Sequence, residues 1–259
     1  VSNGDLTVKQ RNDILHAMEQ EVGEIVLEDA YLQSESISVT EFDGVSHVKE
    51  HIRFVHSLEK TGFLDRQLEF LPDDETLLER EKRGVGFTRP ELSVVIAYAK
   101  MLLKEQLACE RVARDDYHQT LLVNYFPKEL RCHYEVQINS HPLRTEIIAT
   151  ALANQIVNEV GCNFVSRLQE ETGADVIDVV NAYSAARDIF SLDTVMNDIR
   201  KLDNLADAAI QYDVLNQVRR SLRRLSRWIL RNHMGKKSVV ELIARYKADV
   251  QLIMVNLDQ

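Results

Sequence analysis

Apolar residues recur at helical spacing along most of this 259-residue chain. The pattern opens at Thr7 and Gln10, whose spacing is that of a capping box at a helix start. Apolar side chains then follow at intervals of three and four, which predicts a helix with one buried face. They are Ile14, Leu15, Met18, Val22, Ile25 and Val26. The polar stretch 34–44 predicts a loop after this helix.

Further helices are predicted downstream, separated by glycines, prolines and capping residues. Gly62, Gly161 and Gly235 follow apolar helical runs, as C-terminal stops do. Asp175 and the pair Ser238 and Glu241 stand at predicted helix starts. The predicted helical ranges are 45–60, 71–83, 89–113, 115–124, 127–138, 143–160, 163–171, 175–190 and 204–233, with a last helix from 238.

The segment 82–87 interrupts this pattern. Gly84 and Gly86 tolerate backbone angles that other residues resist. Thr88 and Glu91 then have capping-box spacing, and Pro90 lies in the first turn, where a missing N–H has no helical partner to lose. We therefore predict a hinge at 82–87, between an N-terminal helical subdomain (1–83) and a C-terminal helical bundle (84–259).

Composition supports the same fold class. The chain has only 9 Gly and 4 Pro and no convincing strand pair or hairpin turn. The sequence therefore predicts an all-α fold, a multi-helix array of packed helical hairpins with two possible subdomains.

Charge and cysteine content restrict the setting and the partners. A formal net charge of -10 argues against a nucleic-acid partner, because phosphate attraction requires a basic surface. Cys109, Cys132 and Cys162 are far apart and are typical of reduced thiols. No apolar run reaches the length of a membrane span. A cytoplasmic location without membrane contact is predicted.

Several ordered stretches resemble the large-subunit class of bacterial NAD-specific glutamate dehydrogenase. Two of the longest are Gly86-Phe87-Thr88-Arg89-Pro90-Glu91-Leu92-Ser93-Val94 and His141-Pro142-Leu143-Arg144-Thr145-Glu146-Ile147-Ile148-Ala149-Thr150. The others are residues 31–33, 64–66, 69–74, 97–100, 125–127, 170–174 and 227–232. Each stretch alone is weak, but the ordered set is specific and extends over nearly the whole chain.

The resemblance implies a helical C-terminal region, downstream of the catalytic core. In that family, NAD and glutamate are held by other domains, which carry the glycine fingerprint and the catalytic residues. Here Gly84 and Gly86 lack the third glycine and the preceding strand of a dinucleotide loop. The resemblance therefore assigns this chain no catalytic, cofactor or metal residue. It implies a non-catalytic structural, oligomerisation or regulatory portion, whose partners are the catalytic domains of one polypeptide in a homo-oligomer.

The chain begins at Val1 rather than at methionine, and its last apolar helical pattern ends without a stop signal. Both features are interpreted as those of a fragment of a longer polypeptide.

Two histidines fit a metal-binding pattern. The sequence His47-Val48-Lys49-Glu50-His51 matches H-x-x-E-H, in which two histidines share one helix face as zinc ligands do. A solvated helix face bearing histidines explains the same residues, and no third ligand is identifiable. A zinc peptidase is the minor hypothesis.

The arginines of the predicted helix 204–233 are the sharpest electrostatic feature. At 100° per residue, one narrow stripe is formed by Arg220, Arg224, Arg227 and Arg231. We favour salt bridges within the protein or across subunits, because arginine suits interfaces. The alternative is a free-standing interaction module that binds RNA or an acidic partner through this arginine stripe.

Overall fold

The computed structural model describes residues 6–233 and 235–257, and there the chain forms fourteen α-helices, one short 3-10 helix and no strand. The predicted all-α helical array is confirmed. In chain order the helices are α1 (Val8–Phe42), η1 (Val45–His47), α2 (Val48–Lys60), α3 (Asp74–Lys82), α4 (Arg89–Leu107), α5 (Glu110–Ala113), α6 (Asp116–Tyr125), α7 (Lys128–His133), α8 (Glu135–Asn139), α9 (Arg144–Val160), α10 (Phe164–Thr172), α11 (Val176–Ile189), α12 (Leu192–Arg200), α13 (Ala208–His233) and α14 (Val239–Leu257).

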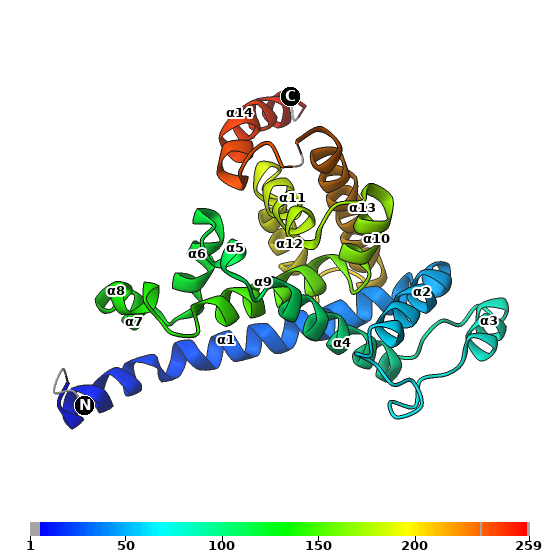
Figure 1. The fold of residues 1–259 in the computed structure, drawn as a ribbon, viewed down its shortest axis with the longest axis horizontal. Helices are drawn as coiled ribbons and strands as arrows, with labels where there is room; N and C mark the ends of the chain where they lie inside the picture. Colours follow the sequence, from blue (N-terminus) through cyan, green and yellow to red (C-terminus); the bar gives the residue numbers. More distant parts are fainter. Residues whose placement is uncertain (1–5, 234, 258–259) are drawn as a thin grey trace.

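Helix α1 is the longest helix, and four other helices pack against it. It contacts α4, α9 and α13, and it contacts α7 nearer its start. In Figure 1 its blue N-terminal part extends past the main body of the molecule. The capping box at its start is present, with the Gln10 N–H donating to Thr7 Oγ1 at 3.2 Å.

The predicted loop at 34–44 is wrong, because α1 continues to Phe42. Hydroxyl side chains in this stretch donate to the carbonyl one turn earlier: Thr40 Oγ1 donates to Ser36 O at 2.7 Å. This bonding satisfies polar groups that would otherwise favour a turn. Ser36, Val39 and Thr40 are buried at three- and four-residue spacing. The burial of this face outweighs the low helix propensity of its residues.

The buried face predicted for the first half of α1 is also wrong. Leu15, Val22, Ile25 and Val26 are exposed, and Leu27 has 72% of its surface exposed. Only Ile14 and Met18 of the predicted set are half-buried. The first half of α1 therefore presents an apolar surface that no described part of the chain covers. In the described residues, no helix is both long and apolar enough to cross a membrane.

Helix α11 lies at the centre of the C-terminal helices. It packs against α10, α12, α13 and α14, an arrangement visible in Figure 1. Its buried residues include Ala182, Ala185 and Ala186, and small side chains let neighbouring helices approach closely. Tyr183 is fully buried, with its ring edge-on to Phe164 at a centroid distance of 5.8 Å.

The segment 84–88 connects α3 to α4 and lies against the end of α1. A Cβ on Gly86 would come within 3.1 Å of the Gly44 carbonyl carbon, so the two backbones are in close contact. Phe87 is buried and packs edge-on to the His51 ring, at 5.7 Å between centroids. The predicted capping box forms, with the Thr88 N–H donating to Glu91 Oε2 at 2.7 Å.

Several predicted helices have different bounds in the structure. The range 89–113 is interrupted between Leu107 and Glu110, and the range 127–138 is divided at Tyr134. The helix predicted from Asn204 begins instead at Ala208, where the Ala209 N–H donates to Asp207 Oδ1 at 2.7 Å. Apolar spacing continues across these breaks, which is why the pattern did not reveal them.

Replacing glycine by alanine is expected to have opposite effects on stability at Gly161 and at Gly23. Gly161 ends α9 with φ 92° and ψ 166°, a conformation available essentially to glycine alone. Gly161→Ala is expected to cost about 1–3 kcal/mol of unfolding free energy. Gly23→Ala, inside α1 where nothing lies within 4 Å of the added Cβ, is expected to stabilise by about 0.5–1 kcal/mol. Urea unfolding followed by circular dichroism measures both changes in unfolding free energy. Changes of the same sign in the two variants would contradict the different roles of Gly161 and Gly23.

Candidate functional site

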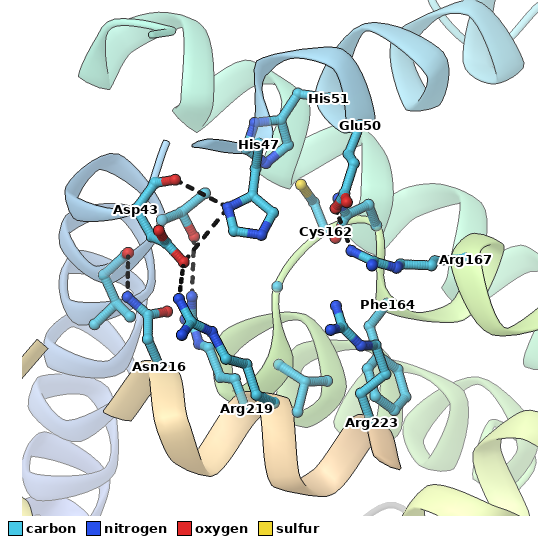
Figure 2. Close-up of a pocket in the computed structure, with 16 residues that line it drawn as sticks. Asp43, His47, Glu50, His51, Cys162, Phe164, Arg167, Asn216, Arg219 and Arg223 are labelled. Atoms are coloured by element: carbon cyan, nitrogen blue, oxygen red, sulfur yellow. Dashed lines mark hydrogen bonds and ion pairs between the residues drawn. The ribbon is translucent and has the colours of Figure 1, made fainter. Parts of the chain in front are cut away.

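The candidate site is a cavity where four segments meet: the end of α1, the η1–α2 region, the α9–α10 connection and α13. Its volume is about 70 Å³. Figure 2 shows His47, Arg167 and Arg223 reaching toward one open centre from three different elements. The charged and titratable residues that line it are Asp43, His47, Glu50, His51, Cys162, Arg167, Arg219, Arg220 and Arg223.

The turn after α9 lines one side of the cavity. The positive φ of Gly161 directs the chain sharply from α9 into α10. Cys162 follows and is buried, and this burial raises the pKa of its thiol to about 12. The thiol is therefore protonated at neutral pH and is not a reactive thiolate.

Arg219 of α13 is the most enclosed cation of the site. Its Nε donates to the Glu159 carbonyl at 3.0 Å, and its Nη2 donates to the Asn158 carbonyl at 3.2 Å. Its Nη1 donates to Thr40 Oγ1 at 3.2 Å. Burial lowers the pKa of this guanidinium to about 10. All three acceptors are neutral, and the described residues provide Arg219 with no carboxylate within ion-pair distance.

Arg223 lies one turn further along α13. Its buried Nε has no hydrogen-bond partner among the described residues. Burial lowers the pKa of the Arg223 guanidinium, and the positive charge of Arg167 adds to this effect. Arg223 thus brings a second incompletely compensated positive charge to the cavity wall.

The remaining charges of the cavity are paired. Arg220 Nη2 lies 2.8 Å from Asp43 Oδ2, and Arg167 forms ion pairs with Glu50 and with Glu171 of α10. The Arg220–Asp43 pair joins the end of α1 to α13, and the Arg167–Glu50 pair joins α10 to α2. They also fix the positions of the arginines around the opening.

The two histidines of the H-x-x-E-H pattern both border this cavity. His47 Nδ1 is 2.9 Å from the Asp43 carbonyl oxygen. His51 is buried, which lowers the pKa of its imidazole to about 4 and keeps it neutral. Among the residues described, no group of three or more His, Cys, Asp or Glu side chains could hold a metal ion. The zinc hypothesis therefore lacks a ligand set in this part of the chain.

The predicted arginine stripe is divided in the structure. Arg220 pairs with Asp43, and Arg227 pairs with Glu171 at 2.9 Å. Arg224 and Arg231 are exposed to solvent. The stripe prediction named Arg220 but missed Arg219 and Arg223, which contribute the unpaired charges. A signal was present, since these two residues border the apolar face of α13 formed by Leu215, Val218 and Leu222.

The fold and this cavity define a helical module without a described strand that could lead into a dinucleotide-binding loop. A family model described as "Glutamate dehydrogenase, C-terminal" matches residues 84–259, and the chain belongs to this family. A second model, "Bacterial NAD-glutamate dehydrogenase, catalytic domain", matches residues 1–40. The resemblance inferred from the sequence is confirmed, whereas the second match was not anticipated.

The chain is similar to three curated proteins, each called NAD-specific glutamate dehydrogenase. The protein from Halomonas elongata is 43% identical over 235 residues, which cover 91% of this chain and 15% of the relative. The Pseudomonas aeruginosa protein is 37% identical over 259 residues, all of this chain and 16% of the relative. The Mycobacterium tuberculosis protein is 29% identical over the same length and share. The chain thus spans about one-sixth of the length of these relatives.

Proposed function

We propose that this chain is a non-catalytic helical portion of an NAD-dependent glutamate dehydrogenase. The parent enzyme would oxidatively deaminate L-glutamate to 2-oxoglutarate and ammonia, with hydride passing to NAD. This portion would brace the catalytic domains of the same polypeptide and contribute contacts in a homo-oligomer. Membership in the C-terminal family and the names of the three relatives support the proposal.

The main support for this proposal is that α1 is buried near its end but exposed in its first half. Residues 1–40 match the catalytic-domain model, yet Ser36, Val39 and Thr40 are buried against the helical body. Upstream of them, Leu15, Val26 and Leu27 expose more than half of their surface. An exposed apolar surface of this kind indicates an interaction site. We assign it to the catalytic domain, which would then be joined to the C-terminal helices by one continuous helix.

We assign NAD binding and the catalytic residues to the rest of the parent enzyme. The described residues include no strand leading through a glycine-rich turn into a helix, which a dinucleotide site of this type requires. The division into 1–83 and 84–259, with a hinge at 82–87, remains part of this proposal. The C-terminal family model begins at residue 84, which is compatible with it.

The alternative is an interaction module that binds RNA or an acidic partner through Arg220, Arg224, Arg227 and Arg231. Two of these four arginines already pair with acids of the same chain. Arg224 and Arg231 are the two that form no ion pair in the described structure, so the unpaired basic surface is smaller than the sequence indicated. The geometry favours a role of the stripe in holding the protein together.

Leu27→Asp in the full-length enzyme tests the assignment of α1. A buried leucine contributes about 1.5–3 kcal/mol, so a charge in its place should weaken the contact with the catalytic domain. Glutamate-dependent NADH formation is expected to fall about tenfold or more. Mass photometry of the same samples would show whether the oligomer is altered.

The matched control is Leu205→Asp, in the connection between α12 and α13. Leu205 is 80% exposed, and neither family resemblance nor helix continuity links it to the catalytic region. The control should retain activity. Unchanged activity and assembly of Leu27→Asp would contradict the bracing role, and glutamate-dependent NADH formation by the 259-residue chain alone would contradict the non-catalytic assignment.

A further inference from the structure

The cavity between α1, α2, the α9–α10 connection and α13 carries a local excess of positive charge. Four arginines and two carboxylates line it, an excess of two positive charges when both histidines are neutral. The whole chain has a net charge of -10. The general composition therefore does not account for the cations at this position.

Arg219 and Arg223 are the two arginines of the cavity that no described carboxylate compensates. Arg219 is bonded only to neutral oxygens, with three of the five N–H groups of a guanidinium in use. Arg223 has a buried Nε without an acceptor in the described structure. A buried charge without an opposite charge is destabilising unless something else neutralises it. Arg219 and Arg223 are partly buried and lack a carboxylate partner in the described structure, which points to an anion as the missing component.

We propose that this cavity binds a small oxyanion carrying two negative charges, of the phosphate or short-dicarboxylate type. Arg223 and the free N–H groups of Arg219 would donate to its oxygens, and Arg220 and Arg167 would add attraction from their paired positions. In Figure 2, Arg219 and Arg223 border the open centre on the side opposite His51, and Arg167 borders it as well. Planar guanidinium groups suit phosphate and carboxylate oxygens because they donate two parallel hydrogen bonds.

The size of the cavity restricts the ligand. Its volume of about 70 Å³ exceeds the roughly 10–15 Å³ that one water requires. It is far below the roughly 300–1,000 Å³ of pockets for drug-sized molecules. A single small ion fits this range, whereas the body of a nucleotide would have to lie outside the opening.

A ligand at this position would connect parts of the chain that match different family models. Thr40 belongs to the region similar to the catalytic domain, and Arg219 belongs to the C-terminal family region. Both line the cavity and are hydrogen-bonded to each other. Because ligand binding stabilises the state that binds, an oxyanion would strengthen the attachment of α1 to the C-terminal helices.

Isothermal titration calorimetry of the 259-residue chain, at constant ionic strength, tests the proposal with inorganic phosphate and with succinate in separate titrations. Binding of at least one probe at 1:1 stoichiometry is expected, and the tighter probe identifies the ligand type. Arg223→Ala removes a charged hydrogen-bond donor, so the dissociation constant should rise about tenfold or more. The Arg223 side chain makes no hydrogen bond in the described structure, so this variant should fold. Circular dichroism checks the folding, and Arg223→Gln is the substitute if Arg223→Ala does not fold.

Arg224→Ala is the matched control, because it removes the same charge from the neighbouring, exposed position of α13. Its dissociation constant should change less than about twofold, as for a surface residue. Equal weakening in both variants would show general electrostatic attraction and overturn the site. Absence of 1:1 binding of both probes would also overturn it, and binding of a short polyglutamate peptide alone would assign the cavity to an acidic protein segment instead.

Discussion

Glu159→Ala is expected to lower the free energy of unfolding by about 3–5 kcal/mol, because it leaves a buried charge without its partner. The Glu159 carboxylate accepts a hydrogen bond from the Tyr183 hydroxyl and one from Arg187 Nε at 3.0 Å. Tyr183 is fully buried, and burial raises the pKa of its hydroxyl well above the ordinary value. The substitution therefore strands a hydroxyl and a guanidinium in the centre of the C-terminal helices.

Urea denaturation followed by circular dichroism measures this effect. Glu170→Ala is the control, since Glu170 is exposed and forms no described ion pair. It should change the unfolding free energy by no more than about 0.5 kcal/mol. A loss of similar size in both variants would mean that the network around Tyr183 and Arg187 does not contribute specifically.

Glu35→Ala is expected to loosen α1 from the C-terminal helices, at a cost of about 3 kcal/mol. Glu35 accepts three hydrogen bonds from Arg200 of α12, and the two shortest are from Nη2 to Oε1 at 2.8 Å and from Nε to Oε2 at 3.0 Å. The Glu35 side chain is only 9% exposed, so its removal leaves Arg200 without an anion in a mostly buried position. Hydrogen exchange should then increase in the second half of α1.

Glu28→Ala, two turns earlier on the exposed part of α1, is the control for this measurement. It removes the same charge from the same helix but breaks no described ion pair. Faster exchange that is confined to Glu35→Ala supports attachment of α1 through Arg200. The same exchange rates in both variants would show that the Glu35–Arg200 pair does not hold the helix in place.

Local chemistry was sufficient to predict most helix starts. Thr7, Thr88 and Asp175 all form the caps that their spacing indicates, since a capping side chain needs only an N–H group three residues away. The stop at Gly161 was also correct, because its positive φ is a local backbone property. The loop prediction for 34–44 was wrong because burial overcame the low helix propensity of these residues. Burial depends on distant parts of the chain, so the local sequence does not reveal it.

The candidate site could be predicted only in part. The H-x-x-E-H pattern and the stripe beginning at Arg220 each named residues that border the cavity. Neither pattern indicated that these residues share one cavity, because α2 and α13 are separated by more than one hundred positions. Arg219 and Arg223 differ from Arg220 and Arg224 by one position each, yet a turn of about 100° decides which guanidinium is enclosed.

Apolar spacing, capping residues and the ordered family-like stretches by themselves determined the all-α class and the membership in the glutamate dehydrogenase family. These properties depend on residues close together in the chain, or on their order along it. Only the tertiary structure decided that no described residue covers the apolar surface in the first half of α1 and that unpaired arginines line the same cavity as His47. Burial and charge compensation depend on which distant helices pack together, and this packing determines where an exposed apolar face and an enclosed positive charge occur.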